Sequence, residues 1–176
     1  MNRSGQFRSD LDSDDPAVVT EAAFQLADAG CREAVPQLLS ILDRGDLRTN
    51  NGVAYALGEL KVQEAKPRLI ELLRDPKTLG NRGSLMYGLM CLDCSDDFAE
   101  ILPFMFDDAF EVRAKVLVIL EAIVPTQVEA TLEAGVRLLE TTAETIPIES
   151  EIHADLDELL DLIDAELDGR PSTTAD

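Results

Sequence analysis

Residues 54–73 read AYALGELKVQEAKPRLIELL, and the same pattern of alanine, leucine and proline stands 31 residues earlier, in AFQLADAGCREAVPQLLSIL at 23–42. One leucine of this pattern recurs with spacings of 31, 32 and 31 residues, as Leu26, Leu57, Leu89 and Leu120. Internal repetition with a period of about 20–50 residues is typical of solenoids and related arrays. The chain is therefore predicted to be a series of repeated units.

Each unit is predicted to contain two helices, because its apolar residues are spaced as on helices and show no sustained alternation of the strand type. The predicted first helices cover 17–29, 48–60, 81–92 and 111–123. The predicted second helices cover 32–42, 64–74, 96–106 and 126–140. Pro103 lies late in its segment, so we expect it to kink or shorten that helix.

The two ends of the chain differ from the repeats, which we expect over 15–148. Residues 1–14 and 169–176 are polar and have little to bury, so both are predicted to be disordered tails. Residues 149–168 are predicted to form an amphipathic helix with one apolar stripe, made of Ile152, Leu156, Leu159, Leu160, Ile163 and Leu167. Because the last unit of a repeat array needs a cap with a polar outer face, we interpret this acidic helix as the C-terminal cap.

Two strings resemble the markers of HEAT-like repeats of the phycobilisome-lyase type. They are ALGEL at 56–60, which ends a first helix, and AKPRLIELL at 65–73, which fits the A-x-P-x-L-x-x-L-L pattern of a second helix. EVR at 111–113 is similar to the x-V-R of a following first helix, and the resemblance extends over 15–140. We therefore predict an all-α fold, a right-handed α-solenoid of about four HEAT-like hairpins closed by the acidic cap. The resemblance implies that second helices line a concave face and that most members bind proteins.

The charge excludes several ligand classes. The 176 residues hold 35 Asp+Glu and 15 Lys+Arg, which gives a net charge of −20. Such a chain repels phosphate backbones and anionic lipid, so neither nucleic acid nor a membrane is expected as its main ligand. No apolar stretch suits a secretory signal or a membrane span, and three cysteines do not suggest a disulfide framework. We expect a cytoplasmic protein.

Few residues are candidates for chemistry. Cys91 and Cys94 form a CxxC, which can be a redox pair or half of a metal site. Their predicted place at a helix C-terminus and the lack of nearby ligands favour a structural role, and His153, the single histidine, has no evident catalytic partner. We therefore predict no catalytic, cofactor-binding or metal-binding residues, and no enzymatic activity.

The residues expected to contact a partner protein lie on the second helices, where the resemblance implies the binding face. They are Arg44, Arg68, Glu71, Arg74, Phe104, Glu129 and Glu133. Arg68, Glu71 and Arg74 are spaced to share one helix face, although the same spacing also suits ion pairing along the helix. Phe104 is the member of an aromatic cluster in the third repeat that we expect to be exposed as a binding hot spot.

Three functions compete at this point. The first is a non-enzymatic protein-binding adaptor or scaffold, whose oligomeric state the sequence does not indicate. The second is an acidic inhibitor or immunity-type protein that neutralises a basic enzyme, such as a nuclease toxin, since complementary charge accelerates the encounter with a cationic partner. The third is a lyase-like or chaperone subunit that acts on a tetrapyrrole protein. Salt-insensitive binding to neutral or acidic partners would exclude the second.

Overall fold

The computed structural model describes residues 3–44 and 46–169. The chain divides into two compact units, Met1–Asp93 and Cys94–Asp176. Within the described residues every regular element is helical, and the α-helices are α1 (Arg3–Asp10), α2 (Pro16–Asp28), α3 (Val35–Arg44), α4 (Leu47–Glu59), α5 (Lys66–Arg74), α6 (Arg82–Met90), α7 (Phe98–Ile101), α8 (Phe110–Ile123), α9 (Glu129–Ala143) and α10 (Ile152–Asp168). The predicted first and second helices are thereby confirmed, with ends that differ by a few residues.

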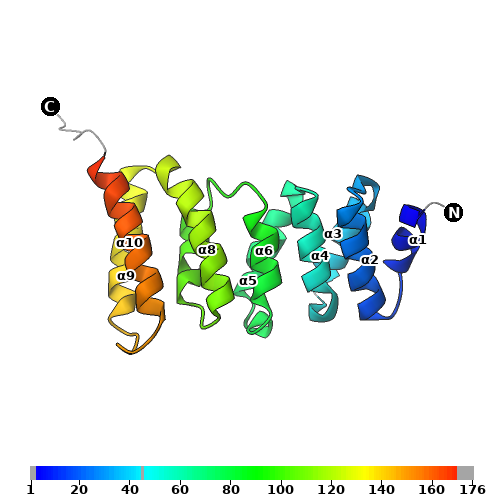
Figure 1. The fold of residues 1–176 in the computed structure, drawn as a ribbon, viewed down its shortest axis with the longest axis horizontal. Helices are drawn as coiled ribbons and strands as arrows, with labels where there is room; N and C mark the ends of the chain where they lie inside the picture. The colour runs from blue at the N-terminus through cyan, green and yellow to red at the C-terminus, as the bar shows by residue number, and fades with distance from the viewer. Residues whose placement is uncertain (1–2, 45, 170–176) are drawn as a thin grey trace. The chain divides into compact units, whose positions relative to one another are not determined.

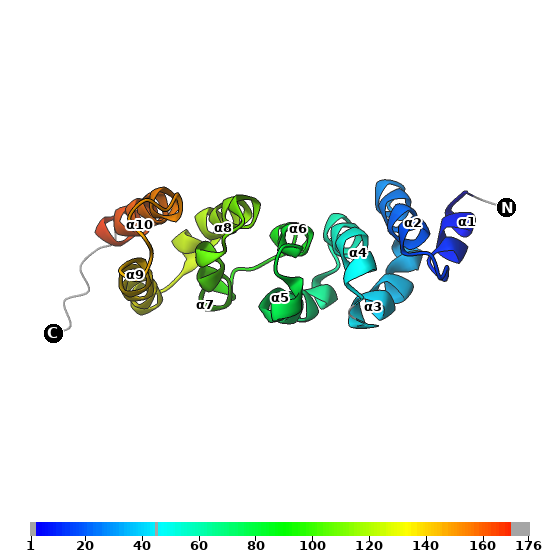
Figure 2. The same cartoon turned by 90° about the horizontal axis from the view of Figure 1, so that it is seen from below.

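Unit 1 has two helical layers (Figure 1, Figure 2). The first helices α2, α4 and α6 lie side by side in one layer, and the second helices α3 and α5 lie in the other. Short 3₁₀ turns at Arg32–Ala34 and Gln63–Ala65 lead into the two second helices. The leucine column of the repeats lies between the layers, since Leu26, Leu57 and Leu89 are fully buried. This is the hairpin architecture of an α-solenoid, as predicted.

Glycines set how closely the first helices pack. A Cβ atom built on Gly88 of α6 would lie 2.5 Å from the carbonyl oxygen of Ala54 in α4. A Cβ atom on Gly58 would lie 2.8 Å from the Cα atom of Gly88, and one on Gly52 would lie 2.8 Å from Cγ2 of Thr20. The helix backbones therefore meet almost directly, at a distance that only glycine allows.

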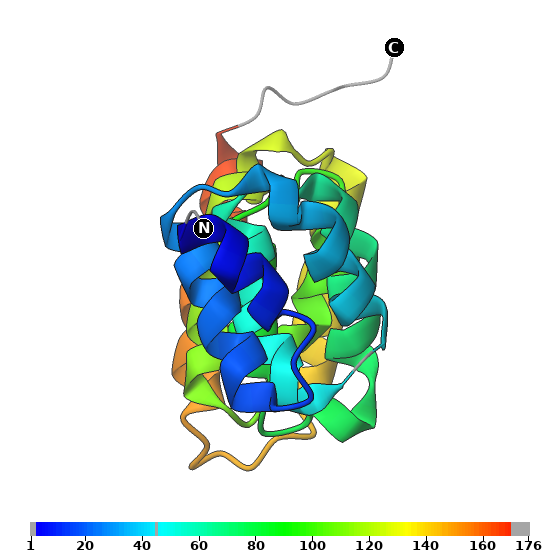
Figure 3. The ribbon, with the colours of Figure 1, turned by 90° about the vertical axis from the view of Figure 1, so that its right-hand side faces the viewer.

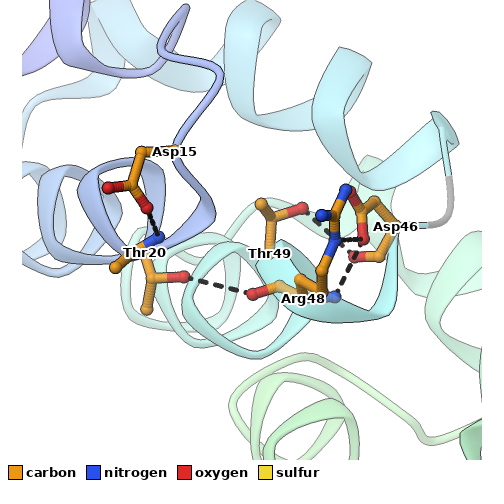
Figure 4. A network of polar contacts seen from close by, with 6 residues as sticks. Asp15, Thr20, Asp46, Arg48 and Thr49 are labelled. Atoms are coloured by element: carbon orange, nitrogen blue, oxygen red, sulfur yellow. Dashed lines mark hydrogen bonds and ion pairs between the residues drawn. The ribbon is translucent and has the colours of Figure 1, made fainter.

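Aspartate caps begin two of these helices (Figure 4). The Asp15 carboxylate accepts a hydrogen bond from the Ala17 N–H at 2.9 Å, and the Asp46 carboxylate, 31 residues on, accepts one from the Arg48 N–H at 3.0 Å. The Arg48 guanidinium also pairs with Asp46 at 2.8 Å. These contacts satisfy N–H groups that a helix start leaves without an intrahelical partner. The helix predicted to begin at residue 17 thus begins at Pro16, directly after the Asp15 cap.

The N-terminal segment differs from the prediction of a disordered tail over 1–14. Residues 3–10 form α1, which lies beside α2 (Figure 3), and the following Leu11 is only 1% exposed. The Gln37 amide of α3 donates to the Arg8 carbonyl at 3.3 Å and to the Asp12 carboxylate at 3.4 Å. One buried leucine and these contacts with α3 order a segment whose composition alone indicates disorder. The tail predicted over 169–176 lies outside the described residues, apart from Gly169.

Unit 2 has a broken second helix and an added helix. α7 ends at Ile101, and a 3₁₀ helix over Leu102–Phe106 continues it, so Pro103 shortens the helix as expected. α8 and α10 lie in one layer, with α7 and α9 in the other (Figure 2). Four residues of the predicted apolar stripe of the last helix, Ile152, Leu156, Leu159 and Ile163, are buried, whereas Leu160 and Leu167 are half-buried.

A buried arginine connects α8 to α10. Arg113 is 2% exposed, and its Nε atom pairs with the carboxylate of Asp155. Its Nη1 atom donates to the carbonyls of Asp107 and Asp108 at 2.9 and 3.1 Å. Asp155 therefore belongs to the interior contact of the last helix, although the sequence alone places its carboxylate on the solvent face.

Candidate binding surfaces

The basic residues predicted on the second helices of unit 1 lie in different surroundings. Arg68 is half-buried and pairs with Glu71 at 2.7 Å, and its Nη2 atom donates to the Asp43 carbonyl of α3 at 3.2 Å. Arg44 and Arg74 end α3 and α5 and are both exposed. Arg68 thus joins two second helices, and the intrahelical pairing considered for it is present.

In unit 2, the prediction that Phe104 is exposed as a binding hot spot is wrong. It is 7% exposed, so it belongs to the core, whereas Phe110 is 64% exposed. The 3₁₀ helix that follows Ile101 turns every 3.0 residues instead of 3.6, so the rings after Pro103 do not point where an α-helix would place them. Glu129 and Glu133 are exposed on α9, and Glu133 pairs weakly with Arg137 at 3.7 Å.

An apolar groove of about 400 Å³ lies beside these two glutamates, between α7 with its 3₁₀ extension and α9. Its lining residues are almost all apolar or small: Phe98, Ala99, Leu102, Ala130, Thr131, Ala134, Gly135 and Leu138. Ala130, Ala134 and Leu138 are four residues apart and therefore share one face of α9. A Cβ atom on Gly135 would lie 2.8 Å from the Phe98 ring, so this glycine lets α9 approach the ring that forms the floor.

A row of aromatic rings crosses the first helices of unit 1. Phe24 of α2 meets Tyr55 of α4 edge to face, with ring centroids 5.0 Å apart. Tyr55 stacks on Tyr87 of α6, with centroids 5.1 Å apart and ring planes 11° from parallel. All three side chains are half-buried. We call Phe24, Tyr55 and Tyr87 the aromatic row.

Carboxylates accompany the row one helical turn later, at Asp28 and Glu59. The Tyr87 hydroxyl donates to Glu59 Oε1 at 2.6 Å, and this bond, with burial, raises the pKa of Tyr87 well above its usual range. Burial, followed by the charges of Glu59 and Asp28, also raises the pKa of Tyr55. The row therefore lies in a negative local field.

The sequence prediction missed the aromatic row, although the repeat alignment contains its signal. The residue two positions before each repeated leucine is Phe24, Tyr55, Tyr87 and then Val118, which is 50% exposed. An aromatic residue in one column of three successive repeats indicates a continuous surface, because equivalent positions of stacked repeats are neighbours.

The cysteines have the properties of structural residues. All three are free thiols, Cys94 is buried and Cys91 is partly exposed. Burial raises the pKa of Cys91 and of Cys31, which is the opposite of what a reactive thiol needs. Across 3–44 and 46–169, no group of three or more His, Cys, Asp or Glu side chains is placed to hold a metal ion. No helix in these ranges is long and apolar enough to cross a membrane.

Stacked helical hairpins define a helical-repeat protein. Residues 7–88 match the family model of HEAT repeats, and the resemblance predicted from the sequence is confirmed there. The match begins inside α1, a segment that composition predicts to lie outside the repeats.

Among solved structures, the complex of CpcE and CpcF of phycocyanin lyase from Nostoc sp. PCC7120 is similar to this chain, with 16% sequence identity and a TM-score of 0.47. The similarity covers 93% of this chain and 95% of that one. No curated protein matches the sequence.

Proposed function

We propose that the protein is a non-enzymatic adaptor that binds a segment of a partner protein in the apolar groove between α7 and α9. The observation that carries the proposal is the groove itself, a hollow of about 400 Å³ walled by helices and lined by apolar and small side chains. Grooves of this kind accept the apolar side chains of a partner helix or strand, while polar groups at the rim set its orientation.

The groove's surroundings indicate what the partner segment carries. Glu129 and Glu133 precede the lining residues Ala130 and Ala134 and are exposed beside the groove. Leu138, also in the lining, is 41% exposed and extends the apolar surface. A segment with apolar anchors and adjacent basic residues fits both features. We further propose a cytoplasmic location, because three free thiols suit a reducing compartment.

A bulky substitution that fills the groove tests this proposal. Partners are isolated with the tagged full-length chain from its source organism, identified, purified and titrated against Ala134→Trp. We expect a loss of affinity of at least ten-fold, because the indole occupies the space that the partner needs. Ala122→Trp, at an exposed alanine of α8 outside the groove, is the matched control and should bind normally. Equal affinity of the two variants would place the binding site elsewhere.

An acidic inhibitor of the immunity type is the second candidate, and the outer face of α10 favours it. Asp157, Glu158, Asp161 and Asp164 are all exposed there. A partner bound through this face would be a basic enzyme, and its association rate would fall steeply with salt. If the identified partner binds with a rate that salt does not change, the inhibitor function is excluded and the groove-based adaptor stands.

A further inference from the structure

We infer a second docking surface in unit 1, where the aromatic row and the carboxylates of Asp28 and Glu59 take an arginine-bearing segment of a protein. This inference does not depend on the groove of unit 2. It rests on a half-buried aromatic surface, on local charge and on the C-terminal ends of α2 and α4.

The aromatic row offers apolar contact to a ligand. Tyr55 stacks on Tyr87 with one face and meets Phe24 edge to face, so the half-buried rings present mainly apolar carbon atoms to a ligand. Such a surface suits the aliphatic stem of a long side chain, which packs along apolar groups while its charged head reaches a polar partner.

The charge at the end of the aromatic row favours a ligand side chain whose charged head is a cation. α2 ends at Asp28 and α4 at Glu59, and the C-terminal carbonyls of a helix carry partial negative charge. The chain already places its own cations at two such ends, since Arg32 donates to the carbonyl of Leu60, the C-cap of α4, at 2.7 Å and Lys61 donates to the carbonyl of Cys91, the C-cap of α6, at 2.9 Å. In the described part of the chain, no side chain forms a hydrogen bond or ion pair with the Asp28 carboxylate.

Arginine fits this arrangement better than lysine. Its planar guanidinium donates to a carboxylate through two parallel N–H groups and can reach a second acceptor with the others. Asp28 supplies the free carboxylate, and the Tyr55 hydroxyl lies within the electrostatic influence of Asp28 and Glu59. The compact ammonium group of a lysine would make a single point contact with the same carboxylate. The site therefore predicts a preference for arginine at equal charge.

The tyrosines provide the assay. The chain has no tryptophan, and Tyr55 and Tyr87 are its only tyrosines, so intrinsic tyrosine fluorescence reports on the row alone. The full-length protein is titrated with a capped Gly-Arg-Gly-Arg-Gly peptide, with its lysine counterpart and with its glutamate counterpart. We expect saturable binding of the arginine peptide, binding about five-fold weaker for the lysine peptide, and none for the glutamate peptide.

Two charge-matched variants separate a defined site from general attraction to an acidic protein. Asp28→Asn should lower the affinity for the arginine peptide about two- to five-fold, which is the range expected for loss of an exposed ion pair. Asp161→Asn removes the same charge from the outer face of α10 and should leave the affinity unchanged. Equal effects of the two variants, or equal affinity for the arginine and lysine peptides, would overturn the inference. Neither result bears on the groove, which the Ala134→Trp variant tests separately.

Discussion

Gly88→Ala tests the close packing of the first helices. The added Cβ atom would lie 2.5 Å from the Ala54 carbonyl oxygen, roughly 0.8 Å short of an ordinary C···O contact of about 3.3 Å. Main-chain atoms cannot rotate away, so α4 and α6 must separate. Overpacking costs about 1–3 kcal/mol, and we expect the upper end here. The higher helix propensity of alanine offsets about 1 kcal/mol, which leaves a net loss of about 2 kcal/mol.

Thermal unfolding followed by circular dichroism measures this loss. For a chain of this size, a net destabilisation of about 2 kcal/mol lowers Tm by roughly 4–8 °C. Gly5→Ala is the matched control, because it makes the same substitution in α1, where a Cβ atom would have no neighbour within 4 Å. Its Tm should be unchanged or slightly higher. A Gly88→Ala protein as stable as the wild type would refute the close approach of the two backbones.

Three further predictions concern stability and ionisation. Arg113→Met leaves the partly buried Asp155 carboxylate without its counter-charge, so the free energy of unfolding in chemical denaturation should fall by about 3–5 kcal/mol. A fall of less than about 1 kcal/mol would contradict the structural role of the pair. Glu59→Gln should return the pKa of Tyr87 toward its usual value of about 10. Ultraviolet titration of tyrosinate measures this pKa in a protein whose other tyrosine, Tyr55, is replaced by Phe. An unchanged titration would show that the hydrogen bond to Glu59 does not raise the pKa of Tyr87. Asp46 has a pKa lowered to about 2, first by its bond with the Arg48 side chain, so its contribution to stability is present above about pH 4 and is lost as the pH falls to about 2. Asp46→Asn should therefore flatten the dependence of Tm on pH in this range, and a parallel curve would contradict the assignment.

The binding surfaces could be predicted only in part. Glu129 and Glu133 were predicted on an exposed second helix and lie beside the groove. The groove itself could not be predicted, because its floor consists of Phe98 and Leu102, about 30 residues away from its α9 wall. Whether the predicted residues contact a partner stays a prediction.

The repeat period, the order of the helices, the shortening at Pro103 and the stripe of the last helix were all determined by the sequence, because each follows from local spacing and from backbone restrictions that act within one helix. Tertiary structure alone decided that Leu11 orders the N-terminal segment, that Phe104 is buried while Phe110 is exposed, and that Asp155 meets Arg113. It also brought Phe24, Tyr55 and Tyr87 into one row. These outcomes depend on which neighbour a side chain meets across the layers, and the spacing of residues along a single helix does not contain that information.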